Sequence, residues 1–327
     1  MFTPLKTGET LRGRYRIRRV IGQGGMGCIY LADDLRLEGR QCALKEVEHD
    51  NTLPANLIKE AREQFQREAT ILARLDHPNL PKVSDFFSIN QNDYLIMDFV
   101  PGKDLRTVML EHREKNKFIS EGEVLNWANQ LSDALTYLHS QNPPILHRDI
   151  KPSNLKITPS GLLKLVDFGL AKLLAPGEVT ITILQGQGTA LYTPLEQYGG
   201  EIGHTDARSD IFSFAATLYH LLTSTPPADA RQRFIDPTAL VPIKQVNPAV
   251  STRTEKAILW GMALHPDDRP SSIEEFREGL IGNRPITISD GNRVSVKLPP
   301  TLSRSSQRVW LLLLGMSVLS LLVTILR

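Results

Sequence analysis

Residues 147–154 read HRDIKPSN, and an apolar strand predicted at residues 162–166 leads directly into Asp167-Phe168-Gly169. The first motif places an acid, an ammonium group and an amide within a few residues of one another. The second places an acid at the end of a strand. Together, in this order and at this separation, the two motifs are the most specific signal in the chain.

A glycine-rich segment lies near the N-terminus, where residues 22–29 have the pattern G-x-G-x-x-G-x-I. Dinucleotide-binding folds use such glycines to bring backbone N–H groups to a pyrophosphate, but a helix follows the loop there. Residues 29–32 here are typical of a strand. The pattern therefore favours a hairpin that folds over phosphates, against a dehydrogenase; a hairpin without a ligand is the plain alternative.

Two charged residues fall within apolar patterns. Lys45 follows Ala43 and Leu44 in a predicted strand, and Glu68 lies on the apolar stripe of a helix predicted at residues 56–75. A charge in either place is costly unless it is paired. We therefore expect a Lys45–Glu68 ion pair that positions the ammonium for a phosphate oxygen. Taken alone, Lys45 is equally consistent with an outward-facing strand lysine, and a helix acid such as Glu68 is more often simply solvated.

The glycine loop, the strand lysine, the helix acid and the two motifs quoted first occur in order and at matching distances. Over residues 15–280 the chain resembles the protein kinases, in particular the eukaryotic-like Ser/Thr kinases of bacteria. The resemblance implies an α+β, two-lobed fold, with an antiparallel sheet and one helix at residues 15–100 and a mainly helical lobe at residues 101–280. It also implies transfer of the ATP γ-phosphate to Ser or Thr hydroxyls of proteins.

By this resemblance, each motif residue has an expected role. Asp149 would accept or orient the proton of the substrate hydroxyl, and Lys151 would sit near the γ-phosphate. Asn154 and Asp167 would hold two Mg2+ ions, for which amide and carboxylate oxygens are suitable ligands. Lys45, oriented by Glu68, would hold the α- and β-phosphates. The positions that match the nucleotide pocket are Ile21, Gly22, Gly24, Gly27, Ile29, Ala43, Lys45, Asp98, Val100 and Asp104.

Further matches lie in the second lobe and argue against a small-molecule phosphotransferase. Glu196 and Arg269 would form the ion pair that anchors the activation segment, and Asp210 would brace the catalytic loop. Arg148 is the residue that, in this family, pairs with a phosphorylated activation segment. We expect autophosphorylation, in trans through a transient homodimer. The threonines concerned are Thr180 and Thr182 as acceptors, with Thr189 contacting the catalytic residues; ordinary solvated threonines are the equal alternative.

Three positions depart from the family pattern. Residues 194–196 carry a proline one place early, so we expect the Glu196 anchor to form with a slightly altered loop. Asp98 replaces a more common glutamate, which changes little. Lys156 stands where an apolar residue usually lies under adenine; its alkyl stem can substitute while the ammonium turns away. Lys156 supports the alternative function, a catalytically weak pseudokinase that acts as a membrane-bound scaffold.

Composition limits the remaining possibilities. The chain has 327 residues, of which 41% are hydrophobic and 23% charged, and this suits about two domains or one large two-lobed domain. A formal charge of +2 excludes a strongly electrostatic nucleic-acid binder as the default interpretation. We interpret residues 1–14 as a lead before the first lobe, and the polar, Pro- and Ser-containing residues 281–308 as a flexible basic linker.

The segment at residues 309–326 reads VWLLLLGMSVLSLLVTIL and carries no charge. As a helix rising about 1.5 Å per residue, it is just long enough to cross the roughly 30 Å core of a bilayer. The basic linker before it predicts that the N-terminal bulk is cytoplasmic. We therefore expect a single-pass anchor in the inner membrane, with the lipid bilayer as a partner; a buried or partner-binding helix is the alternative.

Overall fold

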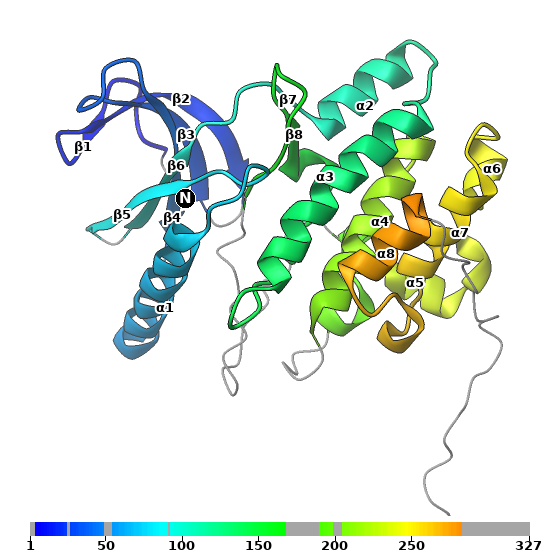
Figure 1. Ribbon diagram of the computed structural model, residues 1–327. Helices are drawn as coiled ribbons and strands as arrows, with labels where there is room; N and C mark the ends of the chain where they lie inside the picture. The colour runs from blue at the N-terminus through cyan, green and yellow to red at the C-terminus, as the bar shows by residue number, and fades with distance from the viewer. Residues whose placement is uncertain are drawn as a thin grey trace, which may run out of the picture. The chain divides into compact units, whose positions relative to one another are not determined.

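The computed structural model describes residues 4–24, 27–48, 54–90, 92–167, 190–198 and 205–282 (Figure 1). All of these residues fall within one compact unit. Within these ranges, no helix combines the length and the apolar character that a membrane crossing requires. The predicted membrane span at residues 309–326 and nearly all of the predicted linker lie outside the described residues.

The first lobe is a six-stranded antiparallel sheet with the strand order β1-β2-β3-β4-β6-β5. Alternate side chains of its strands enter two separate apolar clusters, one on each face: Tyr30 and Leu44 belong to the outer cluster, and Ala43 and Leu95 to the inner one. The antiparallel sheet predicted within residues 15–100 is confirmed. The strands within that range are β2 (Tyr15–Gly24), β3 (Gly27–Asp34), β4 (Gln41–Glu48), β5 (Val83–Ile89) and β6 (Asn92–Asp98), and the unpredicted β1 (Thr10–Leu11) precedes them.

Residues 4–14, interpreted from the sequence as a lead before the first lobe, pack onto its sheet. Strand β1 pairs with β2, and Leu5 packs against the outer apolar cluster. The Leu5 N–H also donates to the Tyr30 hydroxyl at 3.0 Å. This segment therefore covers part of the outer face of the sheet.

Helix α1 (Ala55–Arg74) packs against β5 and β6, and confirms the helix predicted at residues 56–75. Its buried stripe is formed by Phe65, Glu68, Ala69 and Leu72, at the spacing of one helix face. The acid on this stripe, Glu68, is only 3% exposed, so it enters the apolar interface as its position in the sequence predicted.

The second lobe is mainly helical, and α4 (Ala207–Thr223) is its centre, packed against α3, α6, α7 and α8 (Figure 1). Nearly every side chain of α4 from Ser209 onward is buried, as expected of a helix whose residues 211–222 are apolar on nearly every side. A small sheet of β7 (Lys103–Asp104), β8 (Leu155–Ile157) and β9 (Leu163–Leu165) adjoins the helices. The other helices are α2 (Leu105–Glu114), α3 (Glu121–His139), α5 (Ala230–Ile235), α6 (Ile243–Val246), α7 (Thr252–Gly261) and α8 (Ile273–Ile281).

Candidate active site

The loop between α3 and β8 holds the HRDIKPSN motif. A single 3-10 turn, η1 (Pro152–Asn154), brings the Asn154 side chain back to Asp149. The Asn154 amide nitrogen donates to the Asp149 carbonyl oxygen at 2.8 Å and to its Oδ2 at 2.9 Å, and Lys151 Nζ lies 2.9 Å from the same Oδ2. Asp149 Oδ1 has no hydrogen-bond partner among the described residues. The loop thus holds one oxygen of the carboxylate and leaves the other, a buried atom, without a hydrogen-bond partner among the described residues.

Asp210, at the start of α4, binds the backbone of this loop. Its carboxylate accepts hydrogen bonds from the His147 N–H at 2.9 Å and the Arg148 N–H at 2.7 Å, and lies 2.9 Å from His139 Nε2. Burial opposes ionisation of Asp210, but these partners lower its pKa below the ordinary value. Arg148 has a φ of 60°, a conformation that is unusual for a residue other than glycine. Asp210 therefore stabilises a backbone geometry that the loop would not adopt alone.

Asp167 reaches the same place through the hairpin of β8 and β9. Leu155 pairs with Leu165, and the Val166 N–H donates to the Asn154 carbonyl oxygen at 2.8 Å, so Asn154 and Asp167 lie at one end of the hairpin. The Asp167 carboxylate contacts the Lys45 ammonium. The charge of Lys45 lowers the pKa of Asp167 against the opposing effect of burial, so this carboxylate is ionised at neutral pH.

Asn154 and Asp167 fit a Mg2+ site by their donor chemistry. Asn154 uses its amide nitrogen on Asp149, which leaves the amide oxygen available to a cation. Amide and carboxylate oxygens are ligands that Mg2+ accepts. No cluster of three His, Cys, Asp or Glu side chains suited to a metal occurs in the part of the chain that the structure describes. Two protein ligands suit Mg2+, because this ion usually completes its shell with water and substrate phosphates.

Lys45 lies on β4, opposite Ile29 of β3, and thus beside the glycine-rich hairpin. Its described ion pair is with Asp167, whereas Glu68 accepts a hydrogen bond from Gln64 Nε2 at 3.0 Å. The Lys45–Glu68 pair stays a prediction. The structure does bring Lys45 from the first lobe to Asp167 from the second, which places an ammonium group at the Mg2+ site.

The glycine-rich segment is the hairpin between β2 and β3, with Gly24 paired to Gly27. Gly22 lies on β2 opposite Ile29. At Gly27, which has a φ of 142°, an added Cβ would meet the Glu46 carbonyl oxygen of β4 at 1.9 Å. Only glycine allows this close approach of two backbones, so the predicted strand-loop-strand context of the motif is confirmed.

The apolar positions assigned to the nucleotide base come from the same sheet and from the chain that leaves it. Ala43 on β4 and Val100 after β6 are buried, and Ile21 and Ile29 are half-buried. These side chains can supply an apolar surface to an adenine ring.

The polar residues of the connection between the lobes have structural partners of their own. Asp98 is exposed and accepts from the Lys82 N–H at 3.3 Å and from Arg40 at 3.4 Å. Asp104 caps α2 by accepting from the Thr107 N–H at 2.8 Å, a role that the sequence analysis did not predict. A predicted helix that begins after an aspartate is the signal that could have found it.

Lys156 is half-buried on β8, opposite Asp104. Its ammonium lies 5.5 Å from the centre of the Phe99 ring, which follows β6. Burial lowers the pKa of Lys156 below the ordinary value for lysine. A cation over an aromatic face is stabilised by the ring quadrupole, so Phe99 is the group toward which the ammonium turns.

Glu196 and Arg269 form a buried, two-pronged ion pair, with N–O distances of 2.6 and 3.1 Å. Arg269 also donates to the backbone oxygens of Ala263 and Leu264. Glu196 lies in η3 (Leu195–Gln197), which begins directly after Pro194. The early proline therefore starts the 3-10 turn that carries Glu196, and the anchor forms with it. The predicted activation-segment residues Thr180, Thr182 and Thr189 lie outside the described residues.

Asn79 is a buried residue that the sequence analysis missed. The Asn79 side-chain amide donates to the Leu163 carbonyl oxygen at 2.8 Å, and the Asn79 backbone carbonyl accepts from the Leu165 N–H at 2.8 Å. It thereby ties the segment between α1 and β5 to β9, the strand that leads to Asp167. An asparagine directly after Pro78 was the available signal, because such residues favour turns.

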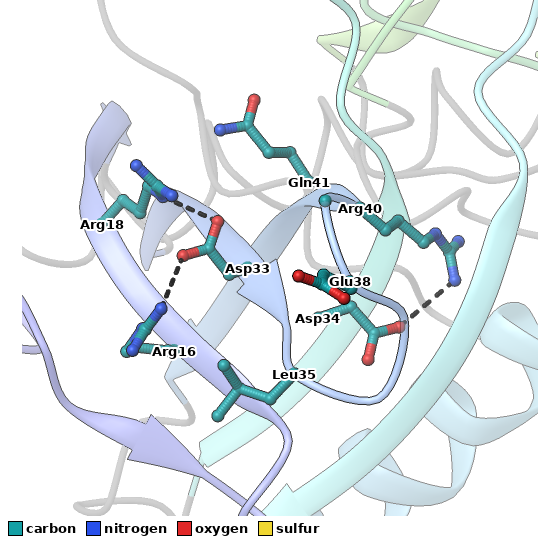
Figure 2. Close-up of a pocket in the computed structure, with 9 residues that line it drawn as sticks. Arg16, Arg18, Asp33, Asp34, Leu35, Glu38, Arg40 and Gln41 are labelled. Carbon is teal, nitrogen blue, oxygen red and sulfur yellow. Dashed lines mark hydrogen bonds and ion pairs between the residues drawn. The ribbon is translucent and has the colours of Figure 1, made fainter.

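A surface hollow is lined by residues of β2, β3 and the turn before β4, among them Arg16, Arg18, Asp33, Asp34 and Arg40 (Figure 2). Its charges are matched within the hollow: Arg16 and Arg18 contact Asp33, and Arg40 contacts Asp34. None of the predicted site residues lines it. Its pairing is that of a solvated salt-bridge network rather than of a binding site.

Comparison with known proteins agrees with this geometry. Residues 15–279 match the protein kinase domain family. The serine/threonine-protein kinase PrkC of Bacillus subtilis is 32% identical over 301 residues, which cover 89% of this chain and 43% of PrkC. The serine/threonine-protein kinase PknB of Mycolicibacterium smegmatis is 30% identical over 320 residues, which cover 92% of this chain and 49% of PknB.

The chain thus spans less than half the length of these two curated relatives. Among solved structures, a variant of the Mycobacterium tuberculosis PknI kinase domain superimposes with a TM-score of 0.65 at 28% identity, covering 85% of this chain and 98% of that one. The fold, the order of the site residues and these matches agree. The chain therefore belongs to the protein kinase family, and its curated relatives are serine/threonine kinases.

Proposed function

We propose that this protein is a serine/threonine kinase that transfers the γ-phosphate of ATP to Ser or Thr hydroxyls of proteins. One observation carries the proposal: Asp149 has one carboxylate oxygen held by Asn154 and Lys151 and the other without a partner in the described residues. A carboxylate arranged in this way can accept a proton from a hydroxyl while its own position is fixed.

In this mechanism Asp149 Oδ1 accepts the hydrogen bond of the substrate hydroxyl and takes its proton as the new O–P bond forms and the bond to the ADP oxygen breaks. Lys151, held beside Asp149, is placed to stabilise negative charge on the transferred group. Lys45 contributes a second ammonium from the first lobe. When bound to Asn154 and Asp167, Mg2+ would neutralise charge on the phosphate oxygens, which is the main requirement of phosphoryl transfer.

The test is transfer from radiolabelled ATP to a Ser/Thr protein substrate. We expect Asp149→Asn to lower kcat by about 10² to 10⁴-fold, the range for loss of a general base, with little change in the melting temperature. Lys45→Ala is expected to lower transfer as well. A matched control is Lys256→Glu, a charge change at an exposed residue of α7. Equal labelling by the wild type and Asp149→Asn would overturn the proposal.

The pseudokinase alternative rests on Lys156, and nucleotide binding tests it. If the protein is a kinase, the wild type already binds Mg-ATP and is active, and Lys156→Leu changes only the affinity. If the wild type binds no Mg-ATP and Lys156→Leu does, the scaffold function is favoured.

We propose further that the protein is autophosphorylated on Thr180 or Thr182, in trans through a transient homodimer. Arg148 supports this, because its Nε is buried without a hydrogen-bond partner among the described residues and a phosphate would supply one. Phosphopeptide mapping after incubation with Mg-ATP tests the sites. The absence of label between residues 170 and 193 would contradict the proposal.

We also propose that residues 309–326 tether the protein to the inner membrane, with the catalytic lobes on the cytoplasmic side. The support is the uncharged apolar run and the basic residues that precede it. Membrane fractionation with and without residues 309–326 tests the tether. A full-length chain that remains in the soluble fraction would contradict it.

A further inference from the structure

We infer that the protein substrates carry acidic residues close to the phosphorylated Ser or Thr, and that Arg106 and Arg113 of α2 bind them. This inference rests on the kinase function proposed above and names the chemistry of its substrate. It concerns a surface beside the catalytic loop that no residue of the proposed mechanism uses.

Helix α2 lies next to the reacting groups. It packs against η1, the turn that carries Asn154, and against α4 (Figure 1). Arg106 and Arg113 are seven residues apart, which is close to two helical turns, so they share one face of α2. Both residues are exposed.

Helix α4 links the catalytic loop to η2 (Ala190–Tyr192) through buried contacts. Thr217 Oγ1 donates to the Ile150 carbonyl oxygen at 3.3 Å, and Ser213 Oγ, one turn earlier, donates to the Tyr192 carbonyl oxygen at 2.8 Å. One turn after Thr217, His220 Nδ1 is hydrogen-bonded to the Tyr192 hydroxyl at 2.6 Å. Helix α4 therefore holds the His220–Tyr192 pair at a fixed position relative to the catalytic loop that carries Asp149.

Arg106 and Arg113 lie within electrostatic reach of this pair. Burial and, to a smaller extent, the charges of the two arginines together lower the pKa of His220 to about 4. Arg106 also acts on Tyr192, against the rise in pKa that burial causes. No carboxylate among the described residues contributes to either shift. The field at this surface is therefore positive, and His220 itself is neutral at pH 7.

The acidic residues in and before α2 have other cations beside them. Glu111 is paired with Lys103 at 2.6 Å, and Asp104, which precedes the helix, lies opposite Lys156 and acts on its pKa. Glu114 follows Arg113 in the chain and points about 100° away from it around the helix axis. Within the described ranges, neither Arg106 nor Arg113 makes an ion pair, so both guanidinium groups can bind a carboxylate of a substrate.

Charge complementarity then selects the substrate. Two exposed guanidinium groups, together with Lys151 beside Asp149, attract a segment that carries Asp or Glu and repel one that carries Lys or Arg. Salt screens such surface charges beyond about 8 Å at physiological ionic strength, so only acids near the acceptor hydroxyl contribute.

Three synthetic peptides test the inference with the full-length chain and Mg-ATP. They share a central Thr and differ only in the flanking residues, which are Asp and Glu, their amides Asn and Gln, or Lys. We expect kcat/KM to be about fivefold higher for the acidic than for the neutral peptide, as two exposed ion pairs predict, mainly through KM. High salt is expected to remove the difference. Placing the acids before or after the Thr locates the surface relative to the acceptor.

The decisive variant is Arg106→Glu with Arg113→Glu, for which we expect the preference to reverse toward the Lys peptide. The matched control is Lys59→Glu with Lys256→Glu, which changes the net charge equally at two exposed residues of α1 and α7. If the wild type shows no preference, or the double reversal keeps it, the inference is wrong while phosphorylation of the neutral peptide still supports the kinase function. If no peptide is labelled above the Asp149→Asn background, both are overturned.

Discussion

Two ion pairs of this protein have the same shortest N–O distance, 2.6 Å, in very different surroundings. Arg269 and Glu196 in the second lobe are 0% and 6% exposed, whereas Arg18 and Asp33 beside the hollow of the first lobe are 54% and 15% exposed (Figure 2). Water can solvate Arg18 or Asp33 if its partner is lost, but Glu196 is almost entirely shielded from it. Burial, rather than distance, therefore decides what each pair contributes.

The same contrast separates the two sides of the candidate active site. The catalytic loop is held by the fully buried Asp210 and its three partners. The glycine-rich hairpin and Lys45 belong to a sheet that meets the second lobe at Asp167. We expect the catalytic loop to be the more rigid and the more sensitive to substitution.

The largest effect is expected at the buried pair. Arg269→Ala leaves the Glu196 carboxylate buried without its cation, and should lower the free energy of unfolding by about 3 to 5 kcal/mol. Arg269→Lys should cost less, because it keeps the charge and loses the two-pronged geometry. Denaturant unfolding measures both, and a loss below about 1 kcal/mol for Arg269→Ala would contradict the role of burial.

Asp210→Asn should have the next largest effect, a loss of about 2 kcal/mol, because hydrogen bonds to an ionised group are exchanged for weaker ones. Since Asp210 acts on the backbone of the catalytic loop, kcat should fall while KM for ATP changes little. The two readouts separate a positioning role from a general loss of stability. An unchanged kcat in folded protein would show that the loop does not need Asp210.

A smaller effect is expected from pH. The pKa of His220 is lowered to about 4 in the folded state, so the unfolded state binds its proton first as the pH falls below about 6.5. The stability that His220 contributes is complete above that pH and is lost progressively down to about pH 4. At pH 5 the loss should be about 1 to 2 kcal/mol relative to pH 7.5. His220→Gln keeps an acceptor for the Tyr192 hydroxyl but does not titrate. Between pH 7.5 and pH 5 its free energy of unfolding should therefore fall by about 1 to 2 kcal/mol less than that of the wild type, as measured by denaturant unfolding at the two pH values.

The smallest effect is expected at the exposed pair. Arg18→Ala should change the free energy of unfolding by no more than about 0.5 kcal/mol, and added salt should reduce even this difference. A loss comparable to that of Arg269→Ala would remove the distinction between the two ion pairs.

Much of the fold was predictable because it depends on local patterns. The apolar stripe at residues 56–75 predicted α1, and the mainly apolar residues 211–222 predicted the buried α4. The glycine loop was correctly interpreted as a hairpin because residues 29–32 favour a strand. The lead at residues 1–14 was underestimated, because a two-residue strand such as β1 has no periodicity to detect.

The sequence by itself determined the family, the order of the motifs and the chemical groups of the candidate site, since these depend on residue type and spacing along the chain. Only the tertiary structure decided which of those groups meet. Lys45 reaches Asp167, and Asp210 binds the backbone of His147 and Arg148. The buried pair of Glu196 and Arg269 likewise joins distant parts of the chain. Such contacts join residues far apart in the chain, and their strength depends on burial, which only packing establishes.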